Sequence, residues 1–394
     1  MTTELQPTSE LRALELLLPR RASDDAPESV RLLDGGELAY PSMLDAIERA
    51  RDRIHLEVYA FARDGIGARF VDALIRASGR GVSVIVRLDG VGSARDGRSV
   101  VATLRASGAN ATIHNPLRSL LVGRWGRNHR KLLLVDDEVA FLGGINIGDE
   151  NVGEGTRLGW ADLALEIRGP ACARLGSAIR GEPPPAKQGS LRIALSRRGG
   201  GWRLRRTYLE AFDRARTRIH VAHGYFLPDG GIVRALTRAA RRGVDVRLLL
   251  AGESDVPLAR AATRSLYRRL IASGVQIHEW TGSVLHAKVT TIDGAQLLVG
   301  SFNLDPFSLA NLEALVSVDD PTVVSQAEDW IQHRFASSRV VTSVEAGTWT
   351  RRWILDPMGR VIAGVVATLG RWIAGSRGSP PWPTRRRRQR TDAR

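Results

Sequence analysis

The chain carries two copies of one polar motif, and this duplication constrains its fold more than any other feature. The stretch NHRKLLLVDDEVAFLGGIN begins at residue 128, and LHAKVTTIDGAQLLVGSFN begins at residue 285. At a constant offset of 157 residues the copies share His129 with His286, Lys131 with Lys288, Asp136 with Asp293, Gly143 with Gly300 and Asn146 with Asn303. The apolar positions differ between the copies, so the agreement lies in residues that core packing does not require. Two similar structural units are therefore expected.

The segments upstream of each motif match as well. MLDAIERARDRIHLEVYAF, from residue 43, aligns with YLEAFDRARTRIHVAHGYF, from residue 208. In each copy, helical periodicity alternates with short β-branched runs such as VSVIVRL (82–88) and VDVRLLL (244–250). This alternation predicts an α/β fold of two similar domains, each a mixed β-sheet flanked by helices. Because each domain carries one copy of the motif, the active site is expected where the two copies face each other, at the pseudo-two-fold interface.

Composition indicates where these units begin and end. Residues 1–28 are expected to form a poorly ordered leader with one short helix, and 29–180 the first domain. The stretch GEPPPAKQGS at 181–190 has the composition of a linker, and 191–340 would form the second domain. Residues 341–394 are predicted to hold an amphipathic helix followed by a basic tail.

The predicted C-terminal helix has two interpretations. Its apolar residues fall within an arc of about 140° at 100° per residue, and they are Val361, Ile362, Val365, Val366, Leu369, Trp372 and Ile373. Such a helix can lie in an anionic membrane interface or pack on the second domain. The RRRR run at 385–388 favours the membrane, because each basic residue near an anionic surface contributes about 1 kcal/mol.

Charge and cysteine content narrow the classes of function. Lys and Arg number 57 against 42 Asp and Glu, a net charge of +15, which indicates an acidic partner such as a membrane, a nucleic acid or a phosphorylated substrate. Arginine-rich codon usage is the alternative explanation. With Cys172 as the single cysteine, neither an intramolecular disulfide nor a cysteine zinc site can form. No signal peptide and no long apolar run is found, so a cytoplasmic protein is expected.

Each motif has the residues of half a phosphate site. The histidine and lysine are two residues apart, which places both on one face of a strand. Asp136-Asp137 and Asp293-Gly294 are turn dipeptides, so each motif is predicted to be a hairpin that its aspartate braces. Lysine would neutralise phosphate oxygens, the asparagine amide and Ser301 would donate to them, and the imidazole could attack or protonate. Two such halves suit in-line displacement through a covalent histidine intermediate.

Lysine usage supports this interpretation. The chain has three lysines, Lys131, Lys187 and Lys288, and two of them stand at equivalent motif positions. The site therefore requires a compact ammonium group, which arginine does not replace.

The double H-x-K-x4-D pattern followed by G-[GS]-x-N resembles the motif of the phospholipase D superfamily. The flanking text, with Trp160-Ala161-Asp162, Gly169-Pro170 and GYFLP at 224–228, is similar to that of the bacterial cardiolipin synthases. The resemblance covers about residues 28 to 340. Asp137 departs from it by replacing a common glycine, and Phe307 stands where a basic residue is common. These departures leave the acceptor lipid open.

The resemblance implies two phospholipase D-like domains and a ping-pong transfer. A histidine attacks phosphatidylglycerol, glycerol leaves, and the hydroxyl of a second lipid takes the phosphatidyl group. His129 is implied as the nucleophile and His286 as acid and then base, although pseudo-symmetry allows the roles to be exchanged. The family also orients each histidine with a downstream carboxylate, and we expect Asp162 to serve His129 and Glu313 to serve His286.

The candidate site residues fall into three groups. The catalytic motif comprises His129, Lys131, Asp136, His286, Lys288 and Asp293, the two aspartates bracing the hairpins; the substrate-binding group is Asn146, Ser301 and Asn303; the histidine-orienting pair is Asp162 and Glu313. No metal and no cofactor is expected, because the lysines supply the positive charge. His223, near Tyr225, is a further candidate for the pocket.

Three functions are therefore compared. The first is a phosphatidyltransferase that makes cardiolipin from phosphatidylglycerol and a second phospholipid, peripheral on the inner face of the cell membrane, with anionic phospholipids as partners. The second is a phospholipase D-type hydrolase or a nucleic-acid phosphodiesterase of the same fold; aromatic residues total 6%, which disfavours nucleic acid as a partner. The third is a silent membrane-binding scaffold, which would not need two intact motifs.

Overall fold

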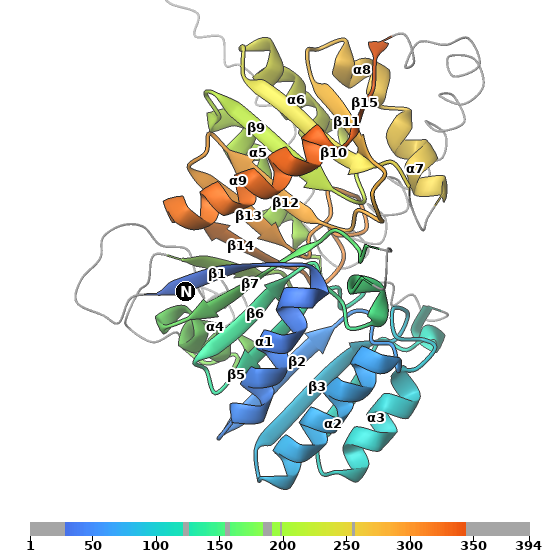
Figure 1. Cartoon of the computed structure of the whole chain (residues 1–394), viewed down its shortest axis with the longest axis vertical. Helices are drawn as coiled ribbons and strands as arrows, with labels where there is room; N and C mark the ends of the chain where they lie inside the picture. The colour runs from blue at the N-terminus through green and yellow to red at the C-terminus, as the bar shows by residue number, and fades with distance from the viewer. Residues whose placement is uncertain are drawn as a thin grey trace, which may run out of the picture.

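The structure is a computed structural model, and it describes residues 28–120, 126–153, 158–183, 191–197, 199–253 and 257–343. The predicted leader apart from Glu28, most of the predicted linker, and the predicted amphipathic helix and basic tail lie outside the described residues. The two halves of the chain are stacked, each built around its own sheet (Figure 1).

The first half forms a seven-stranded mixed sheet of order β1-β7-β6-β5-β2-β3-β4. Strands β2, β3 and β4 run parallel, and the other neighbours are antiparallel. In chain order the elements are β1 (Ser29–Asp34), α1 (Gly35–Arg49), β2 (Arg53–Val58), α2 (Gly65–Gly79), β3 (Ser83–Asp89), α3 (Gly97–Ala106), β4 (Asn110–His114), η2 (Leu117–Leu120), β5 (Leu132–Val135), β6 (Val139–Gly143), η3 (Asp149–Asn151), β7 (Leu163–Arg168) and α4 (Pro170–Arg180).

The second half repeats this sheet and adds one edge strand, in the order β15-β11-β10-β9-β12-β13-β14-β8. Its elements are β8 (Arg192–Leu195), α5 (Gly201–Arg214), β9 (Arg218–His223), α6 (Gly230–Arg241), β10 (Asp245–Ala251), α7 (Pro257–Arg264), α8 (Tyr267–Ile271), β11 (Gln276–Trp280), β12 (Lys288–Ile292), β13 (Gln296–Gly300), β14 (Ala314–Val318), α9 (Pro321–Ala336) and β15 (Arg339–Val340). The predicted pair of mixed sheets flanked by helices is confirmed.

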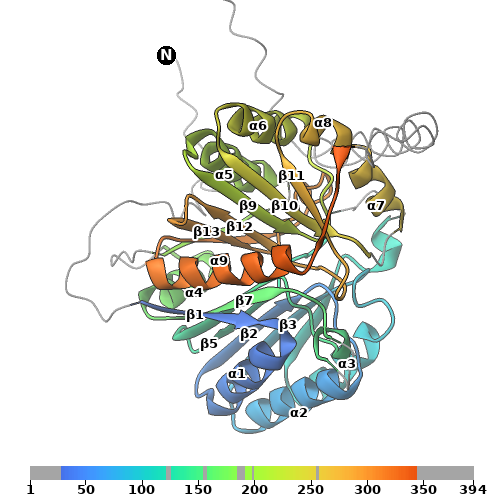
Figure 2. The same cartoon turned by 45° about the horizontal axis from the view of Figure 1, so that its top comes forward.

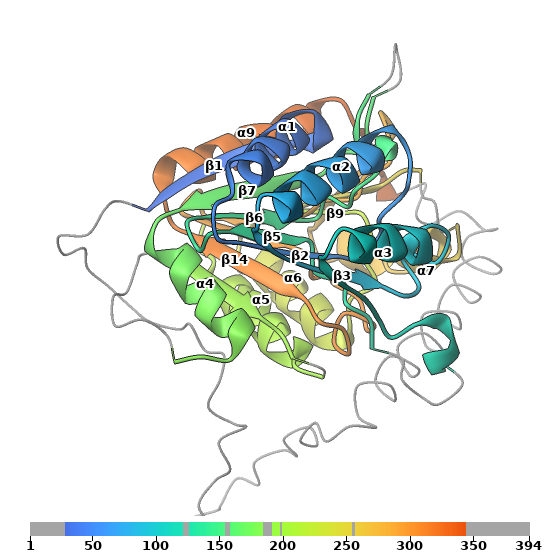
Figure 3. The same ribbon diagram turned by 90° about the horizontal axis from the view of Figure 1, so that it is seen from below.

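Three hydrophobic cores hold these layers together. Helices α1, α2 and α3 cover the outer face of the first sheet (Figure 3), and α5, α6 and α8 cover the outer face of the second (Figure 2). The third core lies between the sheets and includes residues of α4 and α9. Because alternate residues of a strand point to opposite faces, a central strand such as β5 contributes Leu133 to an outer core and Leu134 to the shared one. The halves are therefore joined by buried apolar surface.

The two motif aspartates shape the hairpins. Asp136 and Asp137 have φ of 54° and 55°, and Asp293 and Gly294 have φ of 55° and 64°. Positive φ at both central positions defines the type I′ turn that fits the twist of a hairpin. The Asp136 carboxylate accepts hydrogen bonds of 2.8 to 2.9 Å from the amides of residues 51–53. It thereby ties the hairpin turn to the start of β2, as predicted for a bracing role.

The segments that carry the motif histidines pair with the opposite half. The amide of His129 donates to the Leu312 carbonyl at 2.9 Å, and the amide of His286 donates to the Ala161 carbonyl at 2.9 Å. Parallel bridges join Asn128 to Leu312 and Ala161 to Leu285. The sequence placed the histidines on the hairpin strands, whereas they lie just before β5 and β12. Each histidine therefore sits where the two halves meet.

No helix within the described ranges combines the length and hydropathy needed to cross a membrane.

Candidate active site

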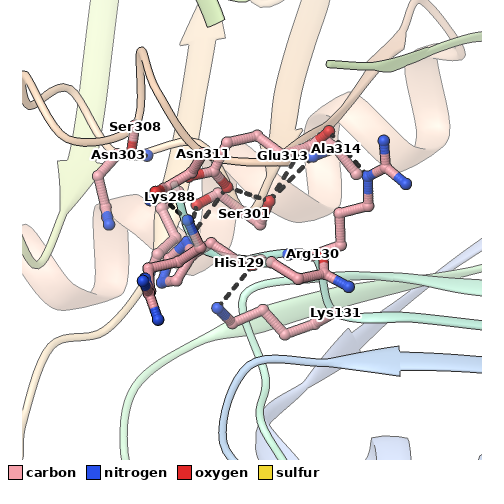
Figure 4. A network of polar contacts seen from close by, with 12 residues as sticks. His129, Arg130, Lys131, Lys288, Ser301, Asn303, Ser308, Asn311, Glu313 and Ala314 are labelled. Atoms are coloured by element: carbon pink, nitrogen blue, oxygen red, sulfur yellow. Dashed lines mark hydrogen bonds and ion pairs between the residues drawn. The ribbon is translucent and has the colours of Figure 1, made fainter. Parts of the chain in front are cut away.

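His129 is held from the second half of the chain. Its Nδ1 lies 3.1 Å from Oε2 of Glu313 and 3.1 Å from the carbonyl oxygen of Ser301 (Figure 4). A carbonyl can only accept a hydrogen bond, so Nδ1 carries the proton and Nε2 keeps its lone pair. The ring of Tyr59 packs edge-on against the imidazole, with the centroids 4.8 Å apart.

His286 is held from the first half. Its Nδ1 lies 2.7 Å from Oδ2 of Asp162, and the ammonium of Lys288 lies 3.1 Å from the same nitrogen. Nδ1 thus stands between an acceptor and a donor, which leaves the position of its proton open to exchange. Tyr225 and Trp160 flank the ring, with centroids at 5.9 and 5.4 Å.

The expected pairing of carboxylates with histidines is therefore wrong. Glu313 contacts His129 and Asp162 contacts His286, the reverse of the prediction. The physical reason is the strand-like pairing of the histidine segments with the opposite half, which brings the Leu312–Glu313 and Ala161–Asp162 peptides alongside them. Both motifs thus share one site, because each half supplies the carboxylate that the other half's imidazole contacts.

The two lysines face this common site. Nζ of Lys131 donates to the His129 carbonyl at 2.8 Å and lies 5.0 Å from the Tyr59 ring centroid. Lys288 donates to the carbonyl of His286 in the same way. Burial, followed by the charge of Lys288, lowers the pKa of Lys131 well below its usual range. An anion between the two ammonium groups would relieve their repulsion.

The partners of Ser301 correct its expected role. Its hydroxyl donates to Oε2 of Glu313 at 2.5 Å and accepts from the amide of Ala314 at 2.9 Å, so its proton is directed to the carboxylate and not to a substrate. The first half has Gly144 at this position, and a Cβ there would lie 2.3 Å from Oδ1 of Asp162. The shorter aspartate thus requires glycine beneath it, whereas the glutamate accommodates serine.

The two asparagines of the substrate-binding group are both buried, at 5% exposure. Oδ1 of Asn146 accepts from the amide of Ala60 at 3.2 Å, which fixes the side chain against the end of β2. Oδ1 of Asn303 has no hydrogen-bond partner in the described part of the chain. This carbonyl oxygen therefore keeps the capacity to accept a hydrogen bond from a ligand.

The protonation of the site follows from burial. Burial and the charge of Lys131 lower the pKa of His129, although Glu313 opposes the shift, so the neutral imidazole is favoured. Burial raises the pKa of Asp162 to about 7, against the opposing charge of Lys288. Asp162 therefore exchanges its proton near neutral pH, and it contacts His286.

Two further groups near the site, Arg130 and Asp305, were not predicted from the sequence. Arg130 is buried and donates to the carbonyl of Ser196 at 2.6 Å and to Glu57 at 3.3 Å, which ties the two halves together beside His129. The sequence feature that could have indicated it is an arginine between the motif histidine and lysine, a position that holds Ala287 in the second copy. Burial also raises the pKa of Asp305 to about 7. Its signal was an acidic residue two positions after Asn303 that the first copy lacks.

Asp136 and Asp293 lie away from the reacting groups, at the opposite end of each hairpin strand from the motif lysine. Asp293 accepts hydrogen bonds from the amides of residues 216–218, as Asp136 does from 51–53. Both carboxylates thus brace their hairpins through backbone amides. Among the described residues, no cluster of three or more His, Cys, Asp or Glu side chains has the arrangement of a metal site.

Comparison with known proteins gives the same pair of units. Residues 43–162 and 208–335 match a family model described as "Cardiolipin synthase, PLD-like domain". Cardiolipin synthase B of Salmonella typhimurium is 34% identical over 327 residues, covering 77% of this chain and 79% of that protein. Cardiolipin synthase of Geobacillus thermodenitrificans is 33% identical over 297 residues, covering 70% of this chain and 59% of that protein.

Among solved structures, phosphatidylserine synthase from Haemophilus influenzae superposes with a TM-score of 0.67 at 13% identity, covering 88% of this chain and 94% of that one. At this identity the likeness concerns the fold.

Proposed function

The chain belongs to the phospholipase D superfamily, in its cardiolipin synthase branch, and from this premise we propose that it makes cardiolipin from phosphatidylglycerol and a second phospholipid. The observation that carries the proposal is the crossed contact of His129 with Glu313 and of His286 with Asp162. A site of this kind offers two imidazoles and two ammonium groups to one phosphodiester. The imidazoles can transfer protons and the ammonium groups can stabilise the phosphate charge, as transfer of a phosphatidyl group requires.

In the first step, Nε2 of His129 attacks the phosphorus of phosphatidylglycerol. The bond from phosphorus to the glycerol oxygen breaks, and protonated His286 gives its proton to that oxygen. In the second step, neutral His286 takes the proton of the acceptor hydroxyl, the resulting oxygen attacks phosphorus, and the phosphorus–nitrogen bond breaks. The lysines neutralise the phosphate oxygens throughout.

The difference between the imidazoles supports these roles. Nδ1 of His129 meets two acceptors, Glu313 and the Ser301 carbonyl, which keeps Nε2 free for attack. Nδ1 of His286 lies between Asp162 and Lys288, groups that can take and give protons. A fixed tautomer suits a nucleophile, and an exchangeable proton suits an acid that becomes a base.

A vesicle assay tests the proposed function. Anionic vesicles containing phosphatidylglycerol labelled in its headgroup glycerol should release free glycerol and accumulate a diphosphatidyl product. Phosphatidic acid alone would indicate a hydrolase, and nicked plasmid with untouched lipid would indicate a nucleic-acid phosphodiesterase. The variants His129→Ala and His286→Ala should each lower turnover by about 10²–10⁴-fold; near-full activity in either would contradict the mechanism.

We also infer that the protein works as a peripheral protein at the inner face of the cell membrane. The net charge of +15 supports this, as does the segment 377–394 with seven arginines and one aspartate. Removing the residues after Trp353 should reduce sedimentation with anionic vesicles. Unchanged sedimentation would assign that segment to another role.

A further inference from the structure

The surroundings of the two motif lysines differ in polarity. In each half, three sequence positions lie behind the motif lysine, on the side of the sheet that the outer helices cover. In the first half these positions hold Met43, Val58 and Leu133. In the second half they hold Tyr208, His223 and Thr290. Positions related by the pseudo-symmetry of the fold thus hold three apolar side chains near the first lysine and three polar ones near the second.

These three polar side chains are fully buried, with 0% exposure for each of Tyr208, His223 and Thr290. Within the described residues, Oη of Tyr208, both ring nitrogens of His223 and Oγ1 of Thr290 have no hydrogen-bond partner. Buried polar atoms are nearly always paired with protein or with ordered water. Four such atoms close to one another leave hydrogen-bonding capacity of the kind that buried water fills in proteins.

The polar side chains lie next to Lys288. His223 stands directly opposite Lys288 in the β9–β12 ladder, so both point to the same face. Thr290 is two residues further along that face. The ring of Tyr208, from α5, meets the His223 imidazole edge-on with the centroids 5.9 Å apart. By contrast, a cavity of about 20 Å³ beside Lys131 is lined mainly by apolar residues that include Met43 and Val58, although Glu57 also lines it.

We propose that His223, Tyr208 and Thr290 hold ordered water behind Lys288 and through it accept a hydrogen bond that keeps Lys288 an ammonium group. His223 is thus a positioning residue that acts through the lysine. In the described part of the first half, the three corresponding positions hold Met43, Val58 and Leu133, which offer no side-chain acceptor, so we expect the two lysines to differ in proton affinity. The catalytic consequence rests on the proposed function: the charge that binds phosphate would persist at the half-site where His286 exchanges protons.

The chemistry of His223 fits this role. Burial, followed by the charge of Lys288, lowers the pKa of His223 to about 3, so the ring is neutral at working pH. A neutral imidazole has one acceptor nitrogen and one donor, and therefore can accept from water that an ammonium group has oriented. An ammonium group gains stability from each acceptor it reaches in a site of low polarity.

Other groups also influence the pKa of Lys288, and the substitutions used in the test leave all of them in place. They are His286 and Tyr225 by contact, and Lys131, His129, Asp162 and Asp305 by charge. A change confined to the polar cluster therefore isolates its own contribution.

The small number of lysines makes this inference measurable. Uniform ¹³C,¹⁵N-lysine labelling of the full chain gives signals from three residues only, Lys131, Lys187 and Lys288, which single Lys→Arg variants assign. A pH titration then gives the pKa of each ammonium group. We expect Lys288 to titrate above Lys131 in the wild-type chain.

The variant His223→Val installs the residue of the first half. It should lower the pKa of Lys288 by about one unit, the size expected for one lost hydrogen bond to an ion, while the Lys187 signal stays unchanged. His223→Gln, which keeps an acceptor, should restore most of that value. Thr290→Val, which has nearly the shape of threonine, should shift Lys288 in the same direction by less. The matched control is Val58→Ala, which loosens packing beside Lys131 without removing a polar group and should leave the titration of Lys288 unchanged.

Two results would overturn the inference. An unchanged Lys288 titration in both His223→Val and Thr290→Val would show that the cluster does not act on the lysine. An equal shift in His223→Val and His223→Gln would show that only packing matters. If His223→Val does not fold, Thr290→Val decides alone. Because the readout is a lysine signal and not a lipid product, a negative vesicle assay would leave this test intact.

Discussion

Glu313 is held by more neighbours than its counterpart Asp162. Its carboxylate accepts a hydrogen bond from the Ser301 hydroxyl at 2.5 Å and lies 3.1 Å from Nδ1 of His129. It also lies 3.4 Å from the side-chain nitrogen Nδ2 of Asn311. These contacts fix the carboxylate, and the carboxylate in turn fixes the imidazole ring. The orientation of the His129 ring therefore depends in part on the Ser301 hydroxyl, which contacts Glu313 and not the imidazole.

The variant Ser301→Ala should lower kcat about tenfold, because a lost hydrogen bond to a carboxylate is worth about 1.5 kcal/mol. KM for the lipid should change little, since the hydroxyl does not face the substrate. Ser317→Ala is the matched control: this serine lies on β14 and contacts Gln296 at 2.9 Å. A large rise in KM for Ser301→Ala, with kcat unchanged, would return this serine to the substrate-binding group.

Asp162 should make stability depend on pH. Burial raises its pKa to about 7, so the folded chain holds this proton more tightly than the unfolded chain. The resulting stabilisation is fully present below the ordinary pKa of about 3.9 and is lost as pH rises through 7. The difference in unfolding free energy between the wild-type chain and Asp162→Asn, measured by urea titration, should therefore shift against the wild type between pH 5 and pH 8. A difference independent of pH would contradict the raised pKa.

Among the structural elements, the two motif hairpins were predictable from the sequence. The contact of each motif histidine with a carboxylate from the other half was not. Periodicity and turn dipeptides gave strands near those observed, because a type I′ turn needs residues such as aspartate and glycine. The reversed partners of Asp162 and Glu313 follow from bridges between segments more than a hundred residues apart. Local pattern carries no information on such contacts. The role of Ser301 was missed for a different reason: the motif pattern does not show that its hydroxyl is directed to Glu313, the residue just before β14.

Asp136 contributes to stability through three backbone amides. The variant Asp136→Ala leaves the amides of residues 51–53 without this acceptor, and it should lower the unfolding free energy by about 1–3 kcal/mol. Turnover per folded molecule should remain near the wild-type value, because this carboxylate is far along β5 from Lys131. Asp45→Ala removes an exposed ion pair with Arg49 and should change stability by less than about 1 kcal/mol. Loss of turnover in a fully folded Asp136→Ala chain would give this aspartate a direct role.

In the described part of the chain, the two halves are joined by a core that they share. Residues of both sheets, with α4 and α9, form the buried layer between them. Helix α9 also reaches the first half through Trp330, whose indole donates to Asp34 at 2.7 Å. The duplication correctly predicted two similar domains. It did not predict the third hydrophobic core that joins them. An apolar run in a strand does not show whether it is buried under a helix of its own half or against the other half.

Urea unfolding should therefore show one cooperative transition. Tryptophan fluorescence and far-ultraviolet circular dichroism are expected to give the same midpoint, since separation of the halves would expose the shared core. The variant Trp330→Ala should move both midpoints together, by an amount equivalent to about 3–5 kcal/mol. Two separate transitions would show that the halves unfold independently.

A crystal structure with vanadate, which mimics the five-coordinate phosphorus of the reaction, tests whether both motifs serve one reacting centre. We expect one vanadium atom bonded to Nε2 of His129, with the His286 imidazole on the opposite side and the ammonium groups of Lys131 and Lys288 on the equatorial oxygens. Vanadate bound to His286 would reverse the assigned roles. Vanadate ions in two separate places, each beside one histidine, would contradict a shared site.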